Sequence, residues 1–302
     1  MSTDALNVLR PPVILLGMHR SGTSLIARLL DELGLFQGNE LQEDHESVYF
    51  LEVNDLLLRR IGASWDNPAP ARDFLKDPKA LELTAKCVRA DLLSKQVTGY
   101  LGLKRYLKYG SPEKLDVPWG WKDPRTVFSL ALWLKLFPAA KLVYIVRNGV
   151  DVASSLRVRE QRELARRIEE YEAKAKKIAG HSMLERAGFK GSARCLTLAG
   201  GFSLWEDYVA EAEAALAAVP NERIVISYER FLANPRDQNE GLAALAAFCG
   251  LEATPGAIDK ALTQVNPGRA RAFLSNPELS AFYQTVKASP WMTKYGYSDL
   301  AT

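Results

Sequence analysis

Residues 13–24 read VILLGMHRSGTS, an apolar run followed by two glycines and a pair of hydroxyl side chains. Val13–Leu16 is typical of a short buried strand, and apolar residues then recur at helical spacing from Thr23 or Ser24 until Gly34. A glycine-rich loop between a strand and a helix is a setting for phosphate, because backbone N–H groups and the helix N-terminus face one concavity. The stretch therefore predicts an anion site at residues 17–24.

This loop differs from the loop of nucleoside-triphosphate enzymes at one decisive position. The motif G-x-x-x-x-G-K-[ST] has lysine where this chain has Thr23, and the nearest cation is Arg20, inside the loop. Such enzymes also place an acidic residue after a second apolar strand, where it organises Mg²⁺. The clearest second strand, KLVYIV at 141–146, is followed by Arg147. With Ser155 on the following helix, Arg147 predicts a second phosphate site and not a metal site.

Two phosphate sites at one sheet edge suggest a nucleotide phosphorylated at both ends. Here the chain resembles the sulfotransferases that use 3′-phosphoadenosine 5′-phosphosulfate (PAPS). HRSGTS (19–24) is similar to their 5′-phosphosulfate loop P-K-S-G-T-[TS], and VRNGVDVASSL (146–156) is similar to their 3′-phosphate motif. SYERFLANP (227–235) is similar to the segment whose tyrosine lies near adenine. WGWKDPRT (119–126) and HESVYF (45–50) resemble bacterial members in particular.

The resemblance implies a role for each matched residue. Arg20 stands where many members have a catalytic lysine, and it would neutralise charge on the oxygen that the sulfuryl group leaves. The residues implied in nucleotide binding are Ser21, Gly22, Thr23, Ser24, Lys122, Arg147, Ser155 and Tyr228. The first four would hold the 5′-phosphate, Arg147 and Ser155 the 3′-phosphate, and Tyr228 would contact adenine. Lys122 is either a further cation for the nucleotide or part of a surface turn, and Arg269 is a weaker candidate for a late phosphate contact.

The general base is expected in the acidic segment after the first helix. An acceptor hydroxyl or amine loses its proton as sulfur arrives, so a base must lie beside the transferred group. The segment NELQEDHESVYFLE offers Glu40, Glu43, Asp44, His45, Glu46 and Glu52. We predict that His45 or Glu46 is the general base, since several branches of the family that this chain resembles have their base after this helix. His19, inside the loop, is interpreted as shaping the loop.

Strands at 13–16, 141–146 and 223–227, and a strand end near residue 120, alternate with helical patterns. This alternation predicts a single α/β domain over residues 1–302, with a central and mainly parallel sheet flanked by helices. The predicted helices begin at residue 23 or 24 and lie at 78–95, 126–137, 202–217, 238–249 and 256–264, with a short one at 52–61. Residues 157–200 form a charged helical insert, either a solvated helix or a lid or acceptor-binding segment.

Composition limits the classes of function. The chain has 302 residues, 47% of them hydrophobic, and a net charge of +3, which is too slight to indicate nucleic-acid binding. Three cysteines and three histidines predict neither a disulfide framework nor a metal site. No signal peptide and no apolar run long enough to span a membrane are found, so we expect a cytoplasmic protein.

The leading hypothesis is a bacterial PAPS-dependent sulfotransferase that needs no metal. Its partners would be PAPS, the product adenosine 3′,5′-bisphosphate, and a hydroxyl or amine acceptor such as a glycan, a glycolipid or a small metabolite. The alternative is a P-loop kinase or nucleotide hydrolase with an altered loop, and a third hypothesis is a catalytically silent nucleotide-binding protein. The aromatic candidates for an acceptor pocket are Trp65, Trp119, Trp121, Tyr106 and Tyr109, and packing in the core is the alternative for the tryptophans. The acceptor and the oligomeric state stay open.

Overall fold

The computed structural model describes residues 6, 9–175, 191–266, 268 and 270–300. The chain divides into two compact units. Unit 1 consists of residues 1–147 and 208–270, and unit 2 consists of residues 148–207 and 271–302. A single domain over residues 1–302 stays a prediction.

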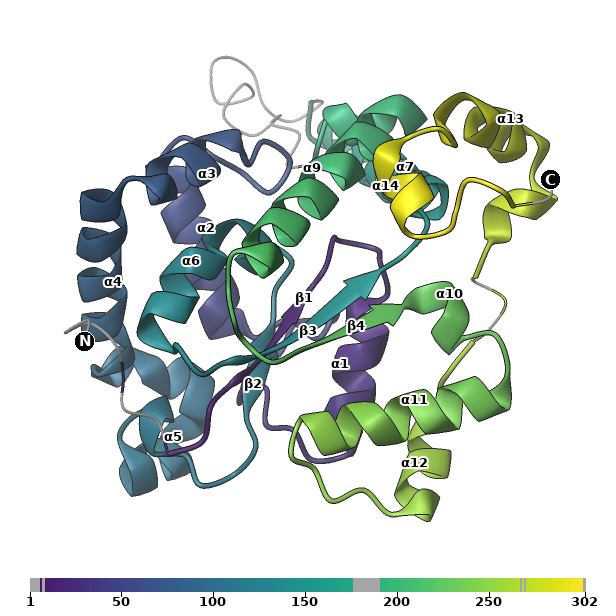
Figure 1. The fold of residues 1–302 in the computed structure, drawn as a ribbon. Helices are drawn as coiled ribbons and strands as arrows, with labels where there is room; N and C mark the ends of the chain where they lie inside the picture. The colour runs from purple at the N-terminus through teal and green to yellow at the C-terminus, as the bar shows by residue number, and fades with distance from the viewer. Residues whose placement is uncertain (1–5, 7–8, 176–190, 267, 269, 301–302) are drawn as a thin grey trace. The chain divides into compact units, whose positions relative to one another are not determined.

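Four parallel strands form the sheet of unit 1, in the order β2-β1-β3-β4 (Figure 1). Their bounds are Val13–Leu16 for β1, Gly120–Lys122 for β2, Lys141–Val146 for β3 and Arg223–Ser227 for β4. The strands β1 and β2 are buried throughout, and β3 is buried after its first residue. Such continuous burial is typical of parallel strands covered on both faces. The predicted α/β class with a parallel sheet is confirmed.

The helices lie between and around these strands. Unit 1 contains α1 (Thr23–Glu32), α2 (Val48–Arg60), α3 (Ala69–Lys76), α4 (Pro78–Leu92), α5 (Thr98–Tyr109), α6 (Thr126–Leu136), α10 (Tyr228–Phe231), α11 (Pro235–Phe248) and α12 (Pro255–Leu262). Unit 2 contains α7 (Gly149–Ala175), α13 (Pro277–Val286) and α14 (Pro290–Lys294), and α9 (Leu198–Ala217) has residues in both units. Among the described residues, no helix has the length and apolar character needed to cross a bilayer.

One face of the sheet packs against α1, α10, α11 and α12. The strands contribute Val13, Leu15, Val143, Ile145 and Ile226 to this hydrophobic core. These residues alternate along each strand, so their neighbours face the opposite side of the sheet. The helix α1 is thus anchored by its apolar side to the strand that precedes it.

An aromatic cluster fills the space around β2. Trp119 and Trp121 are completely buried, and Trp121 stacks on Phe50 of α2 with ring centroids 4.0 Å apart. Trp133 of α6 meets Trp121 edge-on at 5.0 Å. Of the two expectations for Trp119 and Trp121, core packing is therefore the one that the structure shows.

The helical content was underestimated in residues 36–75, at α5, and at α10, α13 and α14, which were not predicted. Residues 36–75 contain both α2 and α3 where one short helix at 52–61 was predicted, and α5 was not predicted at all. Two glycines weaken the helical signal of α5, and Gly102 has non-helical angles (φ 69°, ψ 162°) that kink it. A proline in the first turn of α3 interrupts the pattern but is compatible with a helix start.

The described part of the charged insert is helical as far as residue 175. Within α7, Arg166 and Arg167 both form ion pairs with Glu163, at the spacing of one helical turn. These pairs agree with a solvated helix, and a lid or acceptor-binding role for residues 157–200 stays a prediction. Residues 176–190 lie outside the described residues.

Candidate nucleotide-binding site

The parallel register brings the carboxyl ends of the strands of unit 1 to one edge of the sheet. Leu15 pairs with both Lys122 and Val143, and Val146 pairs with Ser227. The chain runs from β1 to β2 on one side and then crosses back to β3 on the other side, so the direction of the strand order reverses at β1. Open α/β sheets bind ligands at such a switch point. The β1–α1 loop meets Lys122, Arg147 and Tyr228 at this edge.

The β1–α1 loop has the backbone geometry of an anion cradle. Three of its residues have positive φ angles, which are 148° at Gly17, 68° at Arg20 and 96° at Gly22. The helix α1 begins immediately after Gly22, and the N–H groups of a first helical turn have no partner inside the helix. Ser21 is turned inward, because its N–H and hydroxyl both donate to the carbonyl of Met18 at 3.2 and 2.7 Å. The backbone N–H groups at the start of α1, with the hydroxyls of Thr23 and Ser24, are thus the donors suited to an anion, whereas the N–H of the predicted donor Ser21 is bonded to Met18.

Tyr228 and Arg147 fix the position of the loop. A Cβ atom at Gly22 would lie 2.2 Å from Cδ2 of Tyr228, so the tyrosine ring packs directly on this glycine. The guanidinium of Arg147 lies 4.7 Å from the centroid of the same ring, and its Nη1 donates to the carbonyl of Arg20 at 3.1 Å. The ends of β3 and β4 are therefore tied to the loop. Gly22 is required for this ring contact as well as for its positive φ.

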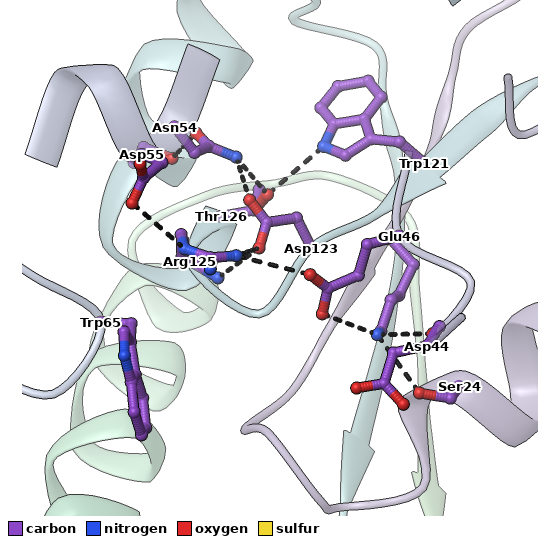
Figure 2. Close-up of polar contacts among 12 residues, drawn as sticks. Ser24, Asp44, Glu46, Asn54, Asp55, Trp65, Trp121, Asp123, Arg125 and Thr126 are labelled. Atoms are coloured by element: carbon purple, nitrogen blue, oxygen red, sulfur yellow. Dashed lines mark hydrogen bonds and ion pairs between the residues drawn. The ribbon is translucent and has the colours of Figure 1, made fainter. Parts of the chain in front are cut away.

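Lys122 is a buried cation beside the start of α1. Its side chain is 2% exposed, so the surface-turn alternative does not hold. Its ammonium donates to Ser24 Oγ at 3.3 Å, to the carbonyl of Asp44 at 2.9 Å and to Glu46 Oε1 at 2.9 Å (Figure 2). An ammonium has three donors and no acceptor. Ser24 Oγ accepts from Lys122, which leaves the hydroxyl hydrogen of Ser24 to donate elsewhere.

Glu46 joins this cation to a second one. Its Oε2 lies 3.5 Å from Nη1 of Arg125, which also lies 2.9 Å from the fully buried carboxylate of Asp123 (Figure 2). Burial raises the pKa of Asp123 above its usual value, and the neighbouring Arg125 opposes this shift. Burial also disfavours the charged form of Arg125, but Asp123 and Glu46 outweigh it and raise the pKa of the guanidinium. Arg125 is therefore a permanent charge held by two carboxylates.

A second layer of hydrogen bonds holds Asp123 in place. Asn54 of α2 donates from Nδ2 to Asp123 Oδ2 at 2.8 Å. The amide oxygen of Asn54 accepts from Ser129 at 2.7 Å and from Trp133 at 2.9 Å. Buried polar groups with this many partners are rigid, since each lost bond leaves an unsatisfied group. The network thus links α2 and α6 to the turn after β2.

The two predicted base candidates point in different directions. His45 has a left-handed backbone (φ 62°), and its Nε2 lies 3.2 Å from the carboxylate of Asp31 in the last turn of α1. At 1.5 Å per residue, Asp31 is about 12 Å along the helix from its first residue, Thr23. The structure therefore brings Glu46 to the loop and turns His45 toward the far end of α1.

The two residues of the predicted 3′-phosphate pair belong to different units. Ser155 lies on α7 in unit 2, where it is partly buried. Arg147 belongs to unit 1, and its pairing with Ser155 stays a prediction. Arg269 lies outside the described residues.

Three side chains around the loop gave little or no signal in the sequence. No site role was predicted for Asp123 or Arg125, although the charged pair in WGWKDPRT is a usable signal. Tyr208 comes from the distant helix α9, and its hydroxyl donates to the carbonyl of Trp65 at 2.9 Å. His19 packs edge-on against Trp65, with ring centroids 5.0 Å apart. This packing agrees with a loop-shaping role for His19.

The arrangement offers donors and cations for anionic groups. Within the ranges that the structure describes, no group of three or more His, Cys, Asp or Glu side chains is placed to hold a metal ion. The N–H groups at the start of α1, the hydroxyls and the guanidinium of Arg147 are instead suited to phosphate oxygens. The site can therefore bind an anionic ligand across the ends of β1 and β3.

Comparison with family models identifies the family of this chain. A model described as "Sulfotransferase family" matches residues 11–255. No match was found among curated proteins. The sulfotransferase domain from the curacin biosynthetic pathway is 15% identical with a TM-score of 0.48, covering 97% of this chain and 100% of that one. The sulfotransferase domain of the Synechococcus PCC 7002 olefin synthase is 16% identical with a TM-score of 0.47, covering 100% and 99%. Sulfotransferase STF1 from Mycobacterium tuberculosis H37Rv is 16% identical with a TM-score of 0.46, covering 85% and 72%.

Proposed function

Since the chain belongs to the sulfotransferase family over residues 11–255, and its activity is therefore sulfuryl transfer, we propose that PAPS is the donor. The acceptor would be a hydroxyl or an amine. The observation that carries the proposal is the cluster in which Arg147, at the end of β3, bonds the carbonyl of Arg20 and lies over Tyr228. A nucleoside-triphosphate enzyme needs an acidic residue for Mg²⁺ near this point. A guanidinium there favours a second phosphate.

The donor PAPS would be bound by the loop after β1 and by residues at the ends of β3 and β4. The loop N–H groups at the start of α1 and the hydroxyls of Thr23 and Ser24 would hold the 5′-phosphate. Lys122 would act indirectly, because its ammonium donors already have Ser24, Asp44 and Glu46 as acceptors. By donating to Ser24 Oγ it turns the hydroxyl hydrogen of that serine away from itself and toward the ligand.

The 3′-phosphate and the adenine would lie at the β3 and β4 side. Arg147 supplies a planar guanidinium suited to phosphate oxygens, with Ser155 as its proposed second donor. Tyr228 is buried between Gly22 and Arg147. Tyr228 would hold the loop and the guanidinium of Arg147 together, and its ring would lie beside the adenine.

Arg20 is the proposed catalytic cation. PAPS supplies an activated sulfuryl group on its 5′-phosphate. Charge grows on the bridging oxygen as this bond breaks, and a cation inside the loop would neutralise it. The left-handed backbone of Arg20 and the bond from Arg147 to its carbonyl fix its main chain, and its guanidinium is proposed to face the ligand.

Glu46 is proposed as a positioning residue and not as the general base. Its two oxygens lie beside Lys122 and Arg125, and it is 5% exposed. A base must reach the acceptor proton within hydrogen-bond distance, and a carboxylate occupied by two cations is poorly suited to do so. His45 would need to leave Asp31 to reach the loop.

The proposed acceptors are a glycan, a glycolipid or a small metabolite, and the proposed location is the cytoplasm. The test is transfer of radiolabelled sulfate from PAPS to a panel of sugars, lipids and phenols, without added metal. We expect at least one labelled product with the natural chain and far less with Arg20→Ala. Transfer of the γ-phosphate of ATP to the same panel, with no sulfate transfer, would overturn the proposal.

A further inference from the structure

The outward face of α5 exposes two leucines beside two lysines. Leu103 and Leu107 are 68% and 76% exposed, the largest values among the described large apolar side chains. They lie one turn apart in the part of α5 that follows the kink at Gly102, and so share one face. Lys104 and Lys108 form the neighbouring strip and are also exposed. We call these four residues the Leu–Lys face.

The opposite side of α5 is fixed to unit 1. The guanidinium of Arg105 lies 4.1 Å from the centroid of the Phe36 ring. Leu101, just before the kink, is buried, and Tyr109 donates its hydroxyl to Asp116. The helix therefore has a defined inner side, and the exposure of Leu103 and Leu107 follows from its orientation.

Charge around the Leu–Lys face is positive. Residues 103–108 read LKRYLK, with three cations and no acidic residue. Lys108 lies 3.4 Å from the exposed Asp116, so Lys104 carries more of the attraction for an external anion. A third exposed leucine, Leu9, donates its N–H to the carbonyl of Glu113, next to the end of α5. Exposed leucines rimmed by lysines are what an interfacial helix presents to a lipid surface.

We propose that the Leu–Lys face docks on an anionic lipid membrane. The leucines enter the boundary between headgroups and acyl chains, and Lys104 and Lys108 pair with lipid phosphates. A second copy that pairs through the same face also covers the leucines, but it brings the cations of its own LKRYLK stretch to the lysine strip. The proposal goes beyond sulfuryl transfer, and neither one depends on the other.

The test is co-sedimentation of the full chain with phosphatidylcholine vesicles and with vesicles that also contain phosphatidylglycerol. We expect binding to the anionic vesicles only, and weaker binding as salt is raised. At about 1 kcal/mol for each lysine near an anionic surface, Lys104→Gln with Lys108→Gln lowers the partition coefficient by up to about 30-fold, and the pairing of Lys108 with Asp116 reduces its share. Leu103→Gln with Leu107→Gln lowers it by about tenfold or more.

The matched control is Leu83→Gln, which removes an exposed leucine from α4 and should bind like the natural chain. All of these positions are exposed, so urea unfolding should show unchanged stability. Absence of binding to anionic vesicles overturns the proposal, as does equal binding by the lysine variant. A dimer in sedimentation equilibrium that the leucine variant abolishes, without lipid binding, assigns the face to a second copy and also overturns it.

Discussion

Replacement of Glu46 by glutamine tests what the buried carboxylate beside the phosphate loop does. Its oxygens lie 2.9 Å from Nζ of Lys122 and 3.5 Å from Nη1 of Arg125. Glutamine has nearly the same shape, but it has one acceptor oxygen and no charge, so its NH₂ group must face one of the two cations. One contact is lost, and the buried ammonium of Lys122 keeps only neutral acceptors.

The structure limits how large this loss can be. Removal of one partner from a buried ion pair costs about 3–5 kcal/mol. Arg125 keeps Asp123 at 2.9 Å, and Lys122 keeps Ser24 and the carbonyl of Asp44. We therefore expect the free energy of unfolding to fall by about 2–3 kcal/mol. Because Lys122 orients Ser24, the Kd for adenosine 3′,5′-bisphosphate should rise about fivefold, and kcat should fall less than about tenfold.

The assays are urea unfolding followed by circular dichroism, calorimetric titration with the bisphosphate, and turnover. Glu43→Gln is the matched control, because Glu43 lies in the same segment with its side chain exposed, and all three quantities should stay unchanged. A general base contributes about 100-fold or more to the rate. If Glu46→Gln kept its stability but lost that much in kcat, the carboxylate would be a base, and the positioning role would be refuted.

Three further substitutions test the loop and its neighbours. Arg20→Ala should lower kcat about 100- to 1,000-fold and should change the affinity for the bisphosphate little, because Arg147 bonds the main-chain carbonyl of Arg20. If kcat and this affinity fell by the same factor, Arg20 would be a binding residue. Arg147→Ala should raise the Kd of the bisphosphate about 10- to 100-fold, measured by calorimetry, and the Kd of adenosine 5′-monophosphate much less. An equal rise for both ligands would mean that the 3′-phosphate binds elsewhere. Gly22→Ala should destabilise the chain more than Gly34→Ala does in urea unfolding, since both have positive φ but only Gly22 has the Tyr228 ring in the way of a Cβ atom. Each left-handed alanine alone costs about 1–2 kcal/mol, and identical losses in the two variants would contradict the ring contact.

The part of the site that follows from local patterns was predictable. The strands β1, β3 and β4 are marked by short apolar runs, and parallel strands bring their carboxyl ends to one edge. Arg147 and Tyr228 come directly after two of these strands, so their contact with the loop follows from their positions in the sequence. In the structure, Arg147 makes this contact through a hydrogen bond to the carbonyl of Arg20.

The part that depends on irregular backbone was not predictable. His45 and Glu46 are adjacent and equally polar, but a left-handed angle at His45 sends the two side chains in different directions. No period of two or of 3.6 governs such a segment, so the sequence could not choose between them. The ion-pair network joins residues 46, 122 and 125, and only the tertiary packing of α2 and β2 brings these together.

The most direct test of the central claim is a calorimetric titration of the natural chain with two ligands, adenosine 3′,5′-bisphosphate and ATP with Mg²⁺. A loop without its lysine, and with Arg147 in place of a metal-binding carboxylate, should bind the bisphosphate and should show no comparable binding of ATP–Mg²⁺. Tight binding of ATP–Mg²⁺ with no binding of the bisphosphate would contradict the proposal that PAPS is the donor.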